Sequence, residues 1–384
     1  MRKVAVLGAT GSIGVQALDV IAGSDELAVV GLSADSSWEP LIEAAGRHGV
    51  PQIAFVDPDA AEQAAKAWKG RVLSGEQGLR ELVAASGADL VLNGIVGSAG
   101  LGPTIVALTE GIDLALANKE SLVVGGELVT ALAEATGAQI IPVDSEHSAL
   151  FQLIRGEGPG TVERLVLTAS GGPFRGRVDL GGVTREEALA HPTWDMGGRI
   201  SIDSATLANK GFEMIEAHHL FGIPYERIDV LVHPQSLVHS LVHLNDGASL
   251  AHLGYPDMRV PISYALHFPE RADVPLQPLD LAEVGELSFE RPDVDAFPCL
   301  RLAREAGEAG GTAPCVLNAA DEVAVGAFLE GRIAFPAIAQ VVEATLDAMP
   351  LADPAHFEDL YATDREARDR AARLVERADG ALTA

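Results

Sequence analysis

A turn of three glycines lies near the start of the chain, between a short apolar strand and an apolar helix. Gly8-Ala-Thr-Gly-Ser-Ile-Gly14 follows the apolar residues 4–7, and its glycines have the spacing GxxGxxG. Glycines let a backbone approach a pyrophosphate closely, and the N-terminus of the next helix offers N–H donors and partial positive charge. A tight structural turn is the alternative, but the position directly after an N-terminal strand favours dinucleotide binding.

Two carboxylates stand close together in Asp144-Ser145-Glu146, which follows an expected strand over 139–143. Ligands of open parallel sheets bind at the carboxyl ends of strands, so chemistry is expected at this point. In an extended segment residues i and i+2 share a face, and their carboxylates could converge on a hard cation such as Mg²⁺ or Mn²⁺. A solvated N-cap before a helix over 147–153 is an equally open alternative.

The segment from Asp203 to Glu213 combines a serine, an asparagine, a lysine and a glutamate. We interpret it as a cap residue followed by a helix, in which Asn209 and Glu213 lie one turn apart on the same face. A helix N-terminus that carries Ser204, Asn209 and Lys210 suits a phosphate group. A capped surface helix would show the same pattern, so these residues alone do not decide between the two.

Two further segments could reach a bound ligand. Lys119 follows an expected strand over 114–117, where it could hold an anion or polarise a carbonyl; an exposed lysine at a helix start is the alternative. Trp194 and Met196 lie in a loop rich in glycine and proline, without a helical or strand register to bury them. We therefore interpret this loop as a lid that closes over the ligand.

These residues need a sheet whose strand ends lie side by side. Short apolar runs alternate with helical segments over about residues 1–145, which predicts a doubly wound, Rossmann-like parallel sheet. Its expected strands are 4–7, 27–32, 52–56, 90–92, 114–117 and 139–143. A central α/β domain should follow, with strands at 164–168, 228–232 and 249–252, and a helical domain should begin at about residue 300.

The composition excludes several classes of partner. The 384 residues include 27 Lys+Arg and 55 Asp+Glu, so the net charge is −28. Binding to nucleic acid or to an anionic membrane needs a basic surface, which argues against both partners. Any anionic substrate must therefore be held by a few local cations or by a metal ion. Cys299 and Cys315 are too few for a disulfide framework or a four-thiolate zinc site, so we expect a reducing, cytoplasmic location. We also expect no membrane-spanning segment.

Taken together, these segments resemble the 1-deoxy-D-xylulose 5-phosphate reductoisomerase family, which acts in the methylerythritol phosphate route to isoprenoid precursors. The resemblance covers nearly the whole chain in order. The motifs that carry it are GATGSIG (8–14), NKESLV (118–123), PVDSEH (142–147), LTASGGPF (167–174), HPTWDMG (191–197), ISIDSATLANKGFEMIEA (200–217), HPQSLVHS (233–240), GYPDMRVPI (254–262) and LNAADEVAV (317–325).

The resemblance implies a metal-dependent rearrangement and an NADPH-dependent reduction of 1-deoxy-D-xylulose 5-phosphate to 2-C-methyl-D-erythritol 4-phosphate. The implied cofactors are NADPH and one divalent ion (Mg²⁺, Mn²⁺ or Co²⁺), and the implied assembly is a homodimer. The implied domains are a dinucleotide-binding domain over 1–145, a catalytic domain over 146–267 with a lid at about 171–199, a linker over 268–297 and a helical domain over 298–384.

By the same resemblance, the site residues fall into overlapping sets. The metal ligands, which are also catalytic, would be Asp144, Glu146 and Glu213, with Lys119 as a further catalytic residue. The coenzyme would be bound by Gly8, Thr10, Gly11, Ser12, Ile13, Asn118, Glu120 and Gly197. The substrate would contact Lys119, Ser145, Glu146, Ser170, His191, Trp194, Met196, Ser204, Asn209, Lys210 and Glu213.

One segment departs from the family's pattern and bears on the coenzyme. After the second strand the family usually has polar or basic residues for the 2′-phosphate of NADPH, whereas Ser33–Trp38 contains no Lys or Arg. Asp35 stands 21 residues after Gly14, where an acidic residue binds the adenosine ribose in NAD enzymes. We still expect NADPH to be preferred, since Ser36 and Ser37 could donate to the phosphate, but by a smaller margin than in relatives with a basic residue.

Two other classes could use the same opening turn. A phosphorylating semialdehyde dehydrogenase needs a nucleophilic cysteine near mid-chain, whereas Cys299 and Cys315 lie in or beside the expected helical region. A catalytically silent NADP sensor has no need for three carboxylates, a phosphate cradle and a lid together. We reject the first class, and oxidation of NADPH that depends on a metal and on deoxyxylulose phosphate would separate the second from the enzyme.

Overall fold

The chain forms two compact units. The computed structural model describes residues 1–194 and 196–382, with side chains as far as residue 378, so Asp195 of the predicted lid lies outside the described residues. The N-terminal unit comprises Met1–Ser121, Val129–Ser148 and Asp257–Gln277. The C-terminal unit comprises Leu122–Leu128, Ala149–Pro256 and the chain from Pro278 onward. The domain boundaries given above stay predictions.

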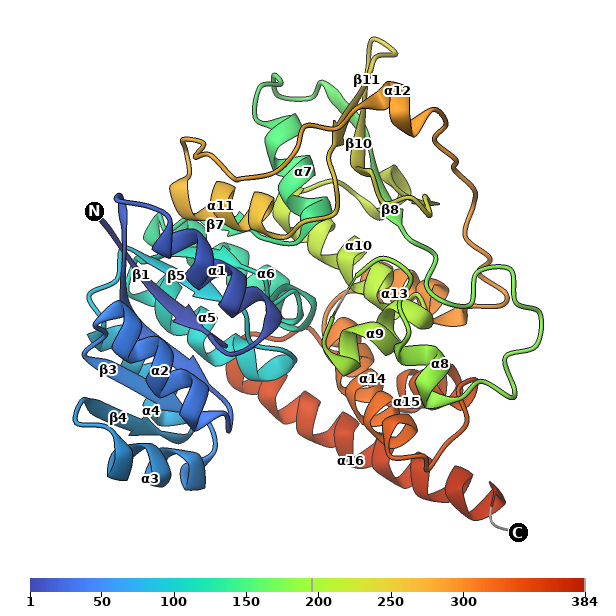
Figure 1. The fold of residues 1–384 in the computed structure, drawn as a ribbon. Helices are drawn as coiled ribbons and strands as arrows, with labels where there is room; N and C mark the ends of the chain where they lie inside the picture. Colours follow the sequence, from blue (N-terminus) through green and yellow to red (C-terminus); the bar gives the residue numbers. More distant parts are fainter. Residues whose placement is uncertain (195, 383–384) are drawn as a thin grey trace. The chain divides into compact units, whose positions relative to one another are not determined.

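A seven-stranded parallel sheet forms the centre of the N-terminal unit (Figure 1). Its strand order is β4-β3-β2-β1-β5-β6-β7, which reverses direction between β1 and β5. The strands are β1 (Arg2–Leu7), β2 (Leu27–Ala34), β3 (Gln52–Phe55), β4 (Arg71–Ser74), β5 (Leu90–Asn93), β6 (Asp113–Leu116) and β7 (Ile140–Pro142). This order confirms the predicted Rossmann-like sheet, in which ligands bind where the strand order reverses.

Helices alternate with these strands because each parallel strand needs a crossover before the next one. They are α1 (Ser12–Ala22), α2 (Trp38–His48), α3 (Pro58–Ala67), α4 (Gly75–Ala85), the short η1 (Ser98–Gly100), α5 (Leu101–Thr109), α6 (Glu120–Thr136) and α7 (Ser145–Ile154), the last two shared with the other unit. Helix α11 (Arg259–His267) joins them from far along the chain and packs against α1. Arg2 donates to the carbonyl of Phe268 at 3.0 Å, which ties the end of α11 to β1.

Strand β4 is absent from the predicted strands because its four residues form no apolar run. Arg71 and Ser74 are exposed, and the two residues between them are half-buried. The strand lies at the edge of the sheet and is defined by its pairing with β3. An edge strand of this kind leaves almost no hydrophobic signal in the sequence.

A mixed four-stranded sheet forms part of the C-terminal unit, with the order β11-β10-β8-β9. Strands β8 (Val162–Ala169) and β9 (Ile228–Val232) are parallel, whereas β10 (Val238–Leu244) runs antiparallel to β8 and to β11 (Ser249–Leu253). The three strands predicted in this region are confirmed. Strand β10 is not among the predicted strands, because two histidines and a serine interrupt its apolar pattern.

The helices of the C-terminal unit contribute most of one large hydrophobic core, which also takes in Leu165, Val230 and Val242 of the sheet. They are α8 (Arg185–Leu189), α9 (Gly198–Ala205), α10 (Ala208–Phe221), η2 (Tyr225–Arg227), α12 (Leu281–Val284), α13 (Pro298–Ala309), α14 (Ala313–Leu329), α15 (Ala337–Ala348) and α16 (Phe357–Leu382). Helices α13 to α16 confirm the predicted helical region. Within the part of the chain that the structure describes, no helix has the length and apolar character to cross a membrane.

Gly211 of α10 is a point of close approach to α13. A Cβ added at Gly211 would lie 2.3 Å from the Cβ of Ala303, so the two helices would have to separate. We predict that Gly211→Ala lowers the free energy of unfolding by about 1–3 kcal/mol, as overpacking does. The matched control is Gly326→Ala in α14, where nothing lies within 4 Å of the added Cβ. Alanine's better helix propensity should raise stability there by up to about 1 kcal/mol. Chemical denaturation of both variants measures these changes, and equal stabilities would contradict the close contact.

Candidate functional site

The carboxyl edge of the seven-stranded sheet carries every site residue predicted in the N-terminal unit. Strand β1 ends before the glycine turn, β6 ends before Asn118–Glu120, and β7 ends before Asp144–Glu146. Parallel strands all end at the same edge of a sheet, and ligands bind there. The fold therefore brings three separate segments of sequence to one edge.

Two positions of the glycine turn require glycine. Gly8 has a φ of +73°, and a Cβ there would lie 2.7 Å from the carbonyl oxygen of Gly94. A Cβ at Gly14 would lie 2.3 Å from the carbonyl oxygen of Gly8. The turn leads directly into α1, whose first N–H groups have no acceptor within the helix. Residues 10–13 therefore form a cradle in which a pyrophosphate group can accept hydrogen bonds.

Asn118 and Glu120, both predicted to bind the coenzyme, hold the loop that follows β5. The side-chain amide of Asn118 donates to the carbonyls of Ile95 (2.8 Å) and Gly97 (2.9 Å). Glu120 Oε1 accepts from the N–H of Gly97 at 2.9 Å, and both side chains are buried. We infer that they position this loop; their direct contact with the coenzyme stays a prediction.

The loop after β5 is a candidate coenzyme contact that the sequence analysis does not name. Gly94 donates its N–H to the carbonyl of Leu7 at 3.0 Å, and Gly8 approaches Gly94 closely, so the loop lies against the glycine turn. A signal for it exists in the sequence, because Gly94 and Gly97 directly follow a short apolar strand. Together with β1, this strand flanks the point where the strand order reverses.

Lys119 and Asp144 form an ion pair between the segments that follow β6 and β7. Their side chains are 9% and 15% exposed. The hydroxyl of Ser145 donates to Glu146 Oε2 at 2.6 Å. Ser145 begins α7, and the carbonyl of Asp144 accepts the N–H of Ser148 at 2.8 Å. Of the two interpretations left open for Asp144–Glu146, the structure shows the helix start, which Asp and Ser favour at this position.

In the C-terminal unit, two glycines bring Ser170 and Ser204 to the same place. Gly171 and Gly172 have φ values of +88° and +66° and turn the chain after β8. The N–H of Gly172 donates to Ser170 Oγ at 3.2 Å. A Cβ at Gly172 would lie 2.8 Å from the carbonyl oxygen of Ser204, so the turn rests against the end of α9.

His191 fixes the direction in which the Ser170 hydroxyl can donate. Its Nδ1 accepts the N–H groups of Thr193 (3.1 Å) and Trp194 (2.9 Å), so the ring proton is on Nε2. That Nε2 donates to Ser170 Oγ at 2.9 Å. Because Ser170 Oγ already accepts this bond and one from Gly172, its own proton is left to donate to a ligand such as phosphate. Burial lowers the pKa of His191, which keeps the ring neutral.

The segment from Asp203 to Glu213 is broken into two helices. Asp203 lies inside α9, and Leu207 stands between α9 and α10 with a φ of +60°. The expectation that Asp203 caps one continuous helix is therefore wrong. The break places Ser204 near the end of α9 and Asn209 in the first turn of α10.

The carboxylate of Glu213 contacts two side chains from the preceding turn of α10. Asn209 Nδ2 donates to Glu213 Oε1 at 2.5 Å, which confirms the predicted one-turn relation, and Lys210 forms an ion pair with Oε2. The side chains of Lys210 and Glu213 are 4% and 2% exposed. A charge buried this deeply needs an opposite charge beside it. The predicted roles of these residues toward phosphate and metal stay predictions.

The predicted lid contains local structure and is anchored in the core. Helix α8 starts with a capping box, in which Thr184 Oγ1 accepts from the N–H of Glu187 at 3.2 Å and the Glu187 carboxylate accepts from Thr184 at 2.9 Å. Phe174, Val183 and Ala188 are buried in the core of the C-terminal unit. Trp194 and Met196 are half-buried, and Gly197 is exposed at the start of α9. Closure of this segment over a ligand stays a prediction.

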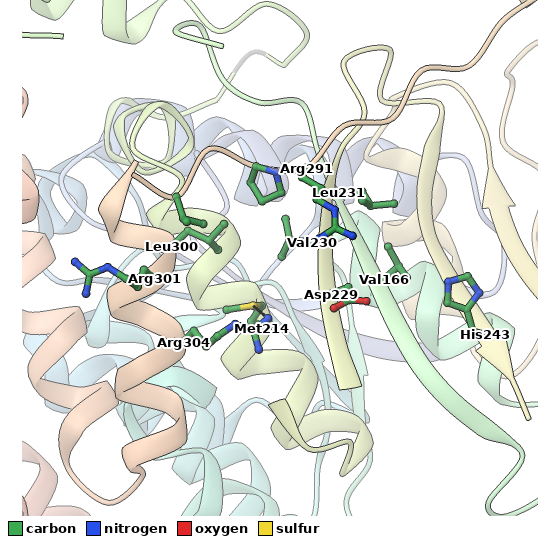
Figure 2. A pocket seen from close by; sticks show the side chains of 12 residues that line it. Val166, Met214, Asp229, Val230, Leu231, His243, Arg291, Leu300, Arg301 and Arg304 are labelled. Atoms are coloured by element: carbon green, nitrogen blue, oxygen red, sulfur yellow. Dashed lines mark hydrogen bonds between the residues drawn. The ribbon is translucent and has the colours of Figure 1, made fainter. Parts of the chain in front are cut away.

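A cavity of about 520 Å³ lies in the C-terminal unit, and its described lining includes no predicted site residue. Figure 2 shows Met214 of α10 beside Arg304 of α13, with Val230 of β9 nearby. Arg304 donates to the carbonyls of Tyr225 (2.8 Å) and Ile228 (2.7 Å). These bonds tie α13 to the start of β9. Arg304 also donates to the sulfur of Met214 at 3.4 Å, which ties α13 to α10 at the residue next to Glu213.

Neither cysteine suits nucleophilic catalysis. Cys299 and Cys315 are both buried and form no disulfide. Burial raises the pKa of Cys315 to about 12 and raises the pKa of Cys299 as well. Since the thiolate is the nucleophile, this burial supports the rejection of the semialdehyde dehydrogenase class.

Sequence comparisons find the same family along most of the chain. Residues 4–126 match the family profile described as 1-deoxy-D-xylulose 5-phosphate reductoisomerase. Residues 140–221 and 253–370 match two profiles that describe C-terminal domains of this reductoisomerase. The chain is 52% identical over 383 residues to the 1-deoxy-D-xylulose 5-phosphate reductoisomerase of Symbiobacterium thermophilum, covering 97% of this chain and 98% of that one. Identity to the enzyme of Gloeobacter violaceus is 48% over 386 residues, covering 98% of each chain.

Solved structures agree with these matches. The 1-deoxy-D-xylulose 5-phosphate reductoisomerase from Zymomonas mobilis in complex with NADPH is 43% identical, with a TM-score of 0.89, over 98% of this chain and 99% of that one. A DOX-P reductoisomerase in complex with NADPH, fosmidomycin and magnesium is 39% identical, with a TM-score of 0.93, over 98% of each chain.

We predict that the turn held by His191 loosens in acid. The pKa of His191 in the folded turn lies below the usual 6.5. When the turn opens and releases the ring, His191 therefore binds a proton at a higher pH than it does in the folded turn. The folded turn loses stability as the pH falls below about 6.5. The added proton would also occupy Nδ1, which accepts two N–H groups. Subtracting the fluorescence of a Trp194→Phe variant leaves the signal of Trp194, which lies in this turn. The Trp194 signal should change on acidification when His191 is present but not when the same subtraction is made in the His191→Asn background. An unchanged Trp194 signal in the parent would contradict the prediction.

Proposed function

This chain belongs to the 1-deoxy-D-xylulose 5-phosphate reductoisomerase family, and we propose that it works through the side chains paired at the strand and helix ends described above. Its activity is the NADPH-dependent and metal-dependent conversion of 1-deoxy-D-xylulose 5-phosphate to 2-C-methyl-D-erythritol 4-phosphate. The observation that supports the residue assignment best is the matched pairing of Lys119 with Asp144 and of Lys210 with Glu213.

The N-terminal unit fits NADPH at its glycine turn. Gly8 and Gly14 allow the turn to be tight, because Cβ atoms there would lie against the backbone of Gly94 and of Gly8. The turn leads into the N-terminus of α1, where backbone N–H groups suit a pyrophosphate. The coenzyme ligands are proposed to be Gly8, Thr10, Gly11, Ser12, Ile13, Asn118, Glu120 and Gly197. Bound NADPH supplies a hydride for the reduction.

Asp144, Glu146 and Glu213 fit a divalent ion. All three offer carboxylate oxygens, the ligands that Mg²⁺ and Mn²⁺ prefer, and neighbouring donors already contact each of them. We propose that they hold Mg²⁺, with Mn²⁺ or Co²⁺ as substitutes. The ion supplies electrostatic stabilisation of the negative charge that develops on oxygen during the rearrangement.

The remaining polar side chains would bind and orient the sugar phosphate. Lys119 and Ser145 would contact the reacting end, where a cation and a hydroxyl favour developing negative charge on oxygen. At the other end, Ser170 presents its hydroxyl proton outward because His191 and Gly172 fill its acceptor positions. The phosphate would be held by Ser170, Ser204, Asn209 and Lys210, with His191 beside them. Fixing both ends of the substrate positions its carbon skeleton for the rearrangement.

Trp194 and Met196 are proposed to cover the bound substrate. Both are half-buried large side chains in a segment whose neighbouring residues are anchored in the core. The rearrangement would form an aldehyde, which is then reduced. Closing large side chains over the site excludes water from this reactive aldehyde.

The assembly, the location and the pathway are further proposals. The edge strand β11 has an exposed Leu253, and Tyr255 beyond it is exposed too, which suits pairing with a second copy in a homodimer. Two buried free cysteines suit a reducing, cytoplasmic location. The product would feed the methylerythritol phosphate route to isoprenoid precursors. A direct test of the activity is the oxidation of NADPH, which should require both the sugar phosphate and a divalent ion.

We predict that Glu213→Gln abolishes metal-dependent turnover while NADPH binding survives. Glutamine keeps the size and one hydrogen-bond acceptor but loses the charge that an oxygen-ligated divalent ion needs. Metal titration of turnover, with coenzyme binding measured separately, tests this. Asp144→Asn should behave in the same way, and Glu226→Gln, an exposed carboxylate of the same unit as Glu213, should have no effect. Normal turnover of Glu213→Gln at limiting metal would remove Glu213 from the metal site.

We predict that Lys210→Ala weakens substrate binding more than coenzyme binding. A lost charged hydrogen bond is worth roughly 1.5–3 kcal/mol, which is about ten- to a hundredfold in affinity. Alanine also leaves the buried Glu213 without its cation, so Lys210→Gln is the matched variant that keeps a hydrogen-bond donor there. Both variants should lose substrate affinity, as measured by equilibrium binding. Equal losses for substrate and NADPH would place Lys210 away from the phosphate.

A further inference from the structure

Strand β2 ends beside the glycine turn, near the place where the adenosine end of a dinucleotide binds in this type of fold. The N–H groups of Gly8 and Ala9 donate to the hydroxyl (3.3 Å) and the carbonyl (2.7 Å) of Ser33, which fixes the end of β2 beside the turn. Asp35 follows two residues later and is exposed. A carboxylate at this position accepts hydrogen bonds from the ribose hydroxyls of a bound coenzyme.

The sequence on either side of this strand end carries little positive charge. Between residues 4 and 65, all described, the chain has one Lys or Arg, which is Arg47. Arg47 lies in the last turn of α2, about 13 Å of helix beyond Trp38, and pairs with Glu43 at 2.8 Å. Arg2, Lys3 and Arg71 stand at the starts of β1 and β4, on the opposite edge of the sheet.

Negative charge gathers there instead. The N–H of Asp57 donates to the carbonyl of Asp35 at 3.2 Å, so the segments that follow β2 and β3 are joined. Asp57 caps α3, Asp59 lies in the first turn of α3, and Glu39 lies in the first turn of α2. A phosphate monoester carries about −1.5 to −2 charges at neutral pH. A 2′-phosphate bound at this strand end would therefore meet carboxylates, with the hydroxyls of Ser36 and Ser37 as its nearest donors in the sequence.

We propose that Asp35 sets the coenzyme selectivity of this enzyme and that NADH is a second coenzyme, bound within about tenfold of the affinity for NADPH. The proposal rests on the proposed function, because it assumes that the coenzyme lies on the glycine turn. With NADH, Asp35 accepts hydrogen bonds from the adenosine ribose hydroxyls. With NADPH, it repels the 2′-phosphate, and the two serine hydroxyls offset part of that repulsion.

The chemistry at the nicotinamide end is the same for both coenzymes. The C4 hydride passes to the aldehyde carbon, the aldehyde oxygen takes a proton, and NADH is oxidised to NAD⁺ while the aldehyde is reduced to an alcohol. Discrimination between the coenzymes therefore depends on contacts at the adenosine end alone.

Equilibrium binding of NADPH and NADH, followed by the fluorescence of the reduced nicotinamide, tests the proposal on the parent and two variants. Asp35→Asn should tighten NADPH binding by about three- to tenfold, as loss of one nearby like charge predicts, and should leave NADH binding equal or weaker. Asp25→Asn is the matched control, because it removes the same exposed charge just before the other end of β2. It should change neither affinity. Higher salt should favour NADPH over NADH in the parent, since salt screens the repulsion.

The outcomes separate this proposal from the one on which it rests. A parent that binds NADPH more than about tenfold more tightly than NADH would overturn the selectivity proposal and leave the reaction assignment standing. Unchanged binding of both coenzymes in Asp35→Asn would do the same. A parent that binds neither coenzyme would overturn the proposed function itself.

Discussion

The pairing of lysines with carboxylates at little-exposed positions is the constraint on which both halves of the site depend. Removing a charge from water costs several kcal/mol, and an adjacent opposite charge offsets this cost only when the geometry is close. Lys119 with Asp144 and Lys210 with Glu213 meet this condition within their own units. In a chain of net charge −28, each pair places a cation directly beside a carboxylate, at the positions proposed above for the metal and the anionic substrate.

The parallel sheet supplies the positions for the first of these pairs. Lys119 and Asp144 are 25 residues apart in sequence, yet adjacent strands β6 and β7 end beside one another. The glycine turn and the loop after β5 reach the same edge by the same rule. This part of the site could be predicted from the sequence, because apolar runs identify parallel strands and the polar residue that follows each run marks the edge.

Other features could not be predicted, since they depend on contacts between distant segments. The sequence of Asp144–Glu146 suits both an extended segment and a helix start, and the bond from Ser148 to Asp144 shows that the helix forms. The family resemblance implies that Asn118 binds the coenzyme, whereas its side-chain amide bonds to the loop after β5. Strand β4 leaves no apolar pattern and is defined by its neighbour β3.

The break between α9 and α10 shows how packing overrides a local helical signal at the place where function needs it. Leu207 has a φ of +60°, a conformation that costs a non-glycine residue about 1–3 kcal/mol. Its side chain is buried in the core of the C-terminal unit, and burying a leucine contributes about 1.5–3 kcal/mol. Burial therefore offsets the strain. In an unbroken helix, Asn209 and Lys210 would not lie in a first turn, and no backbone N–H groups would be free beside Ser204. The strained leucine instead lets one helix end and another begin within three residues, so that the N–H groups freed at the start of α10 lie beside the side chains proposed to hold phosphate.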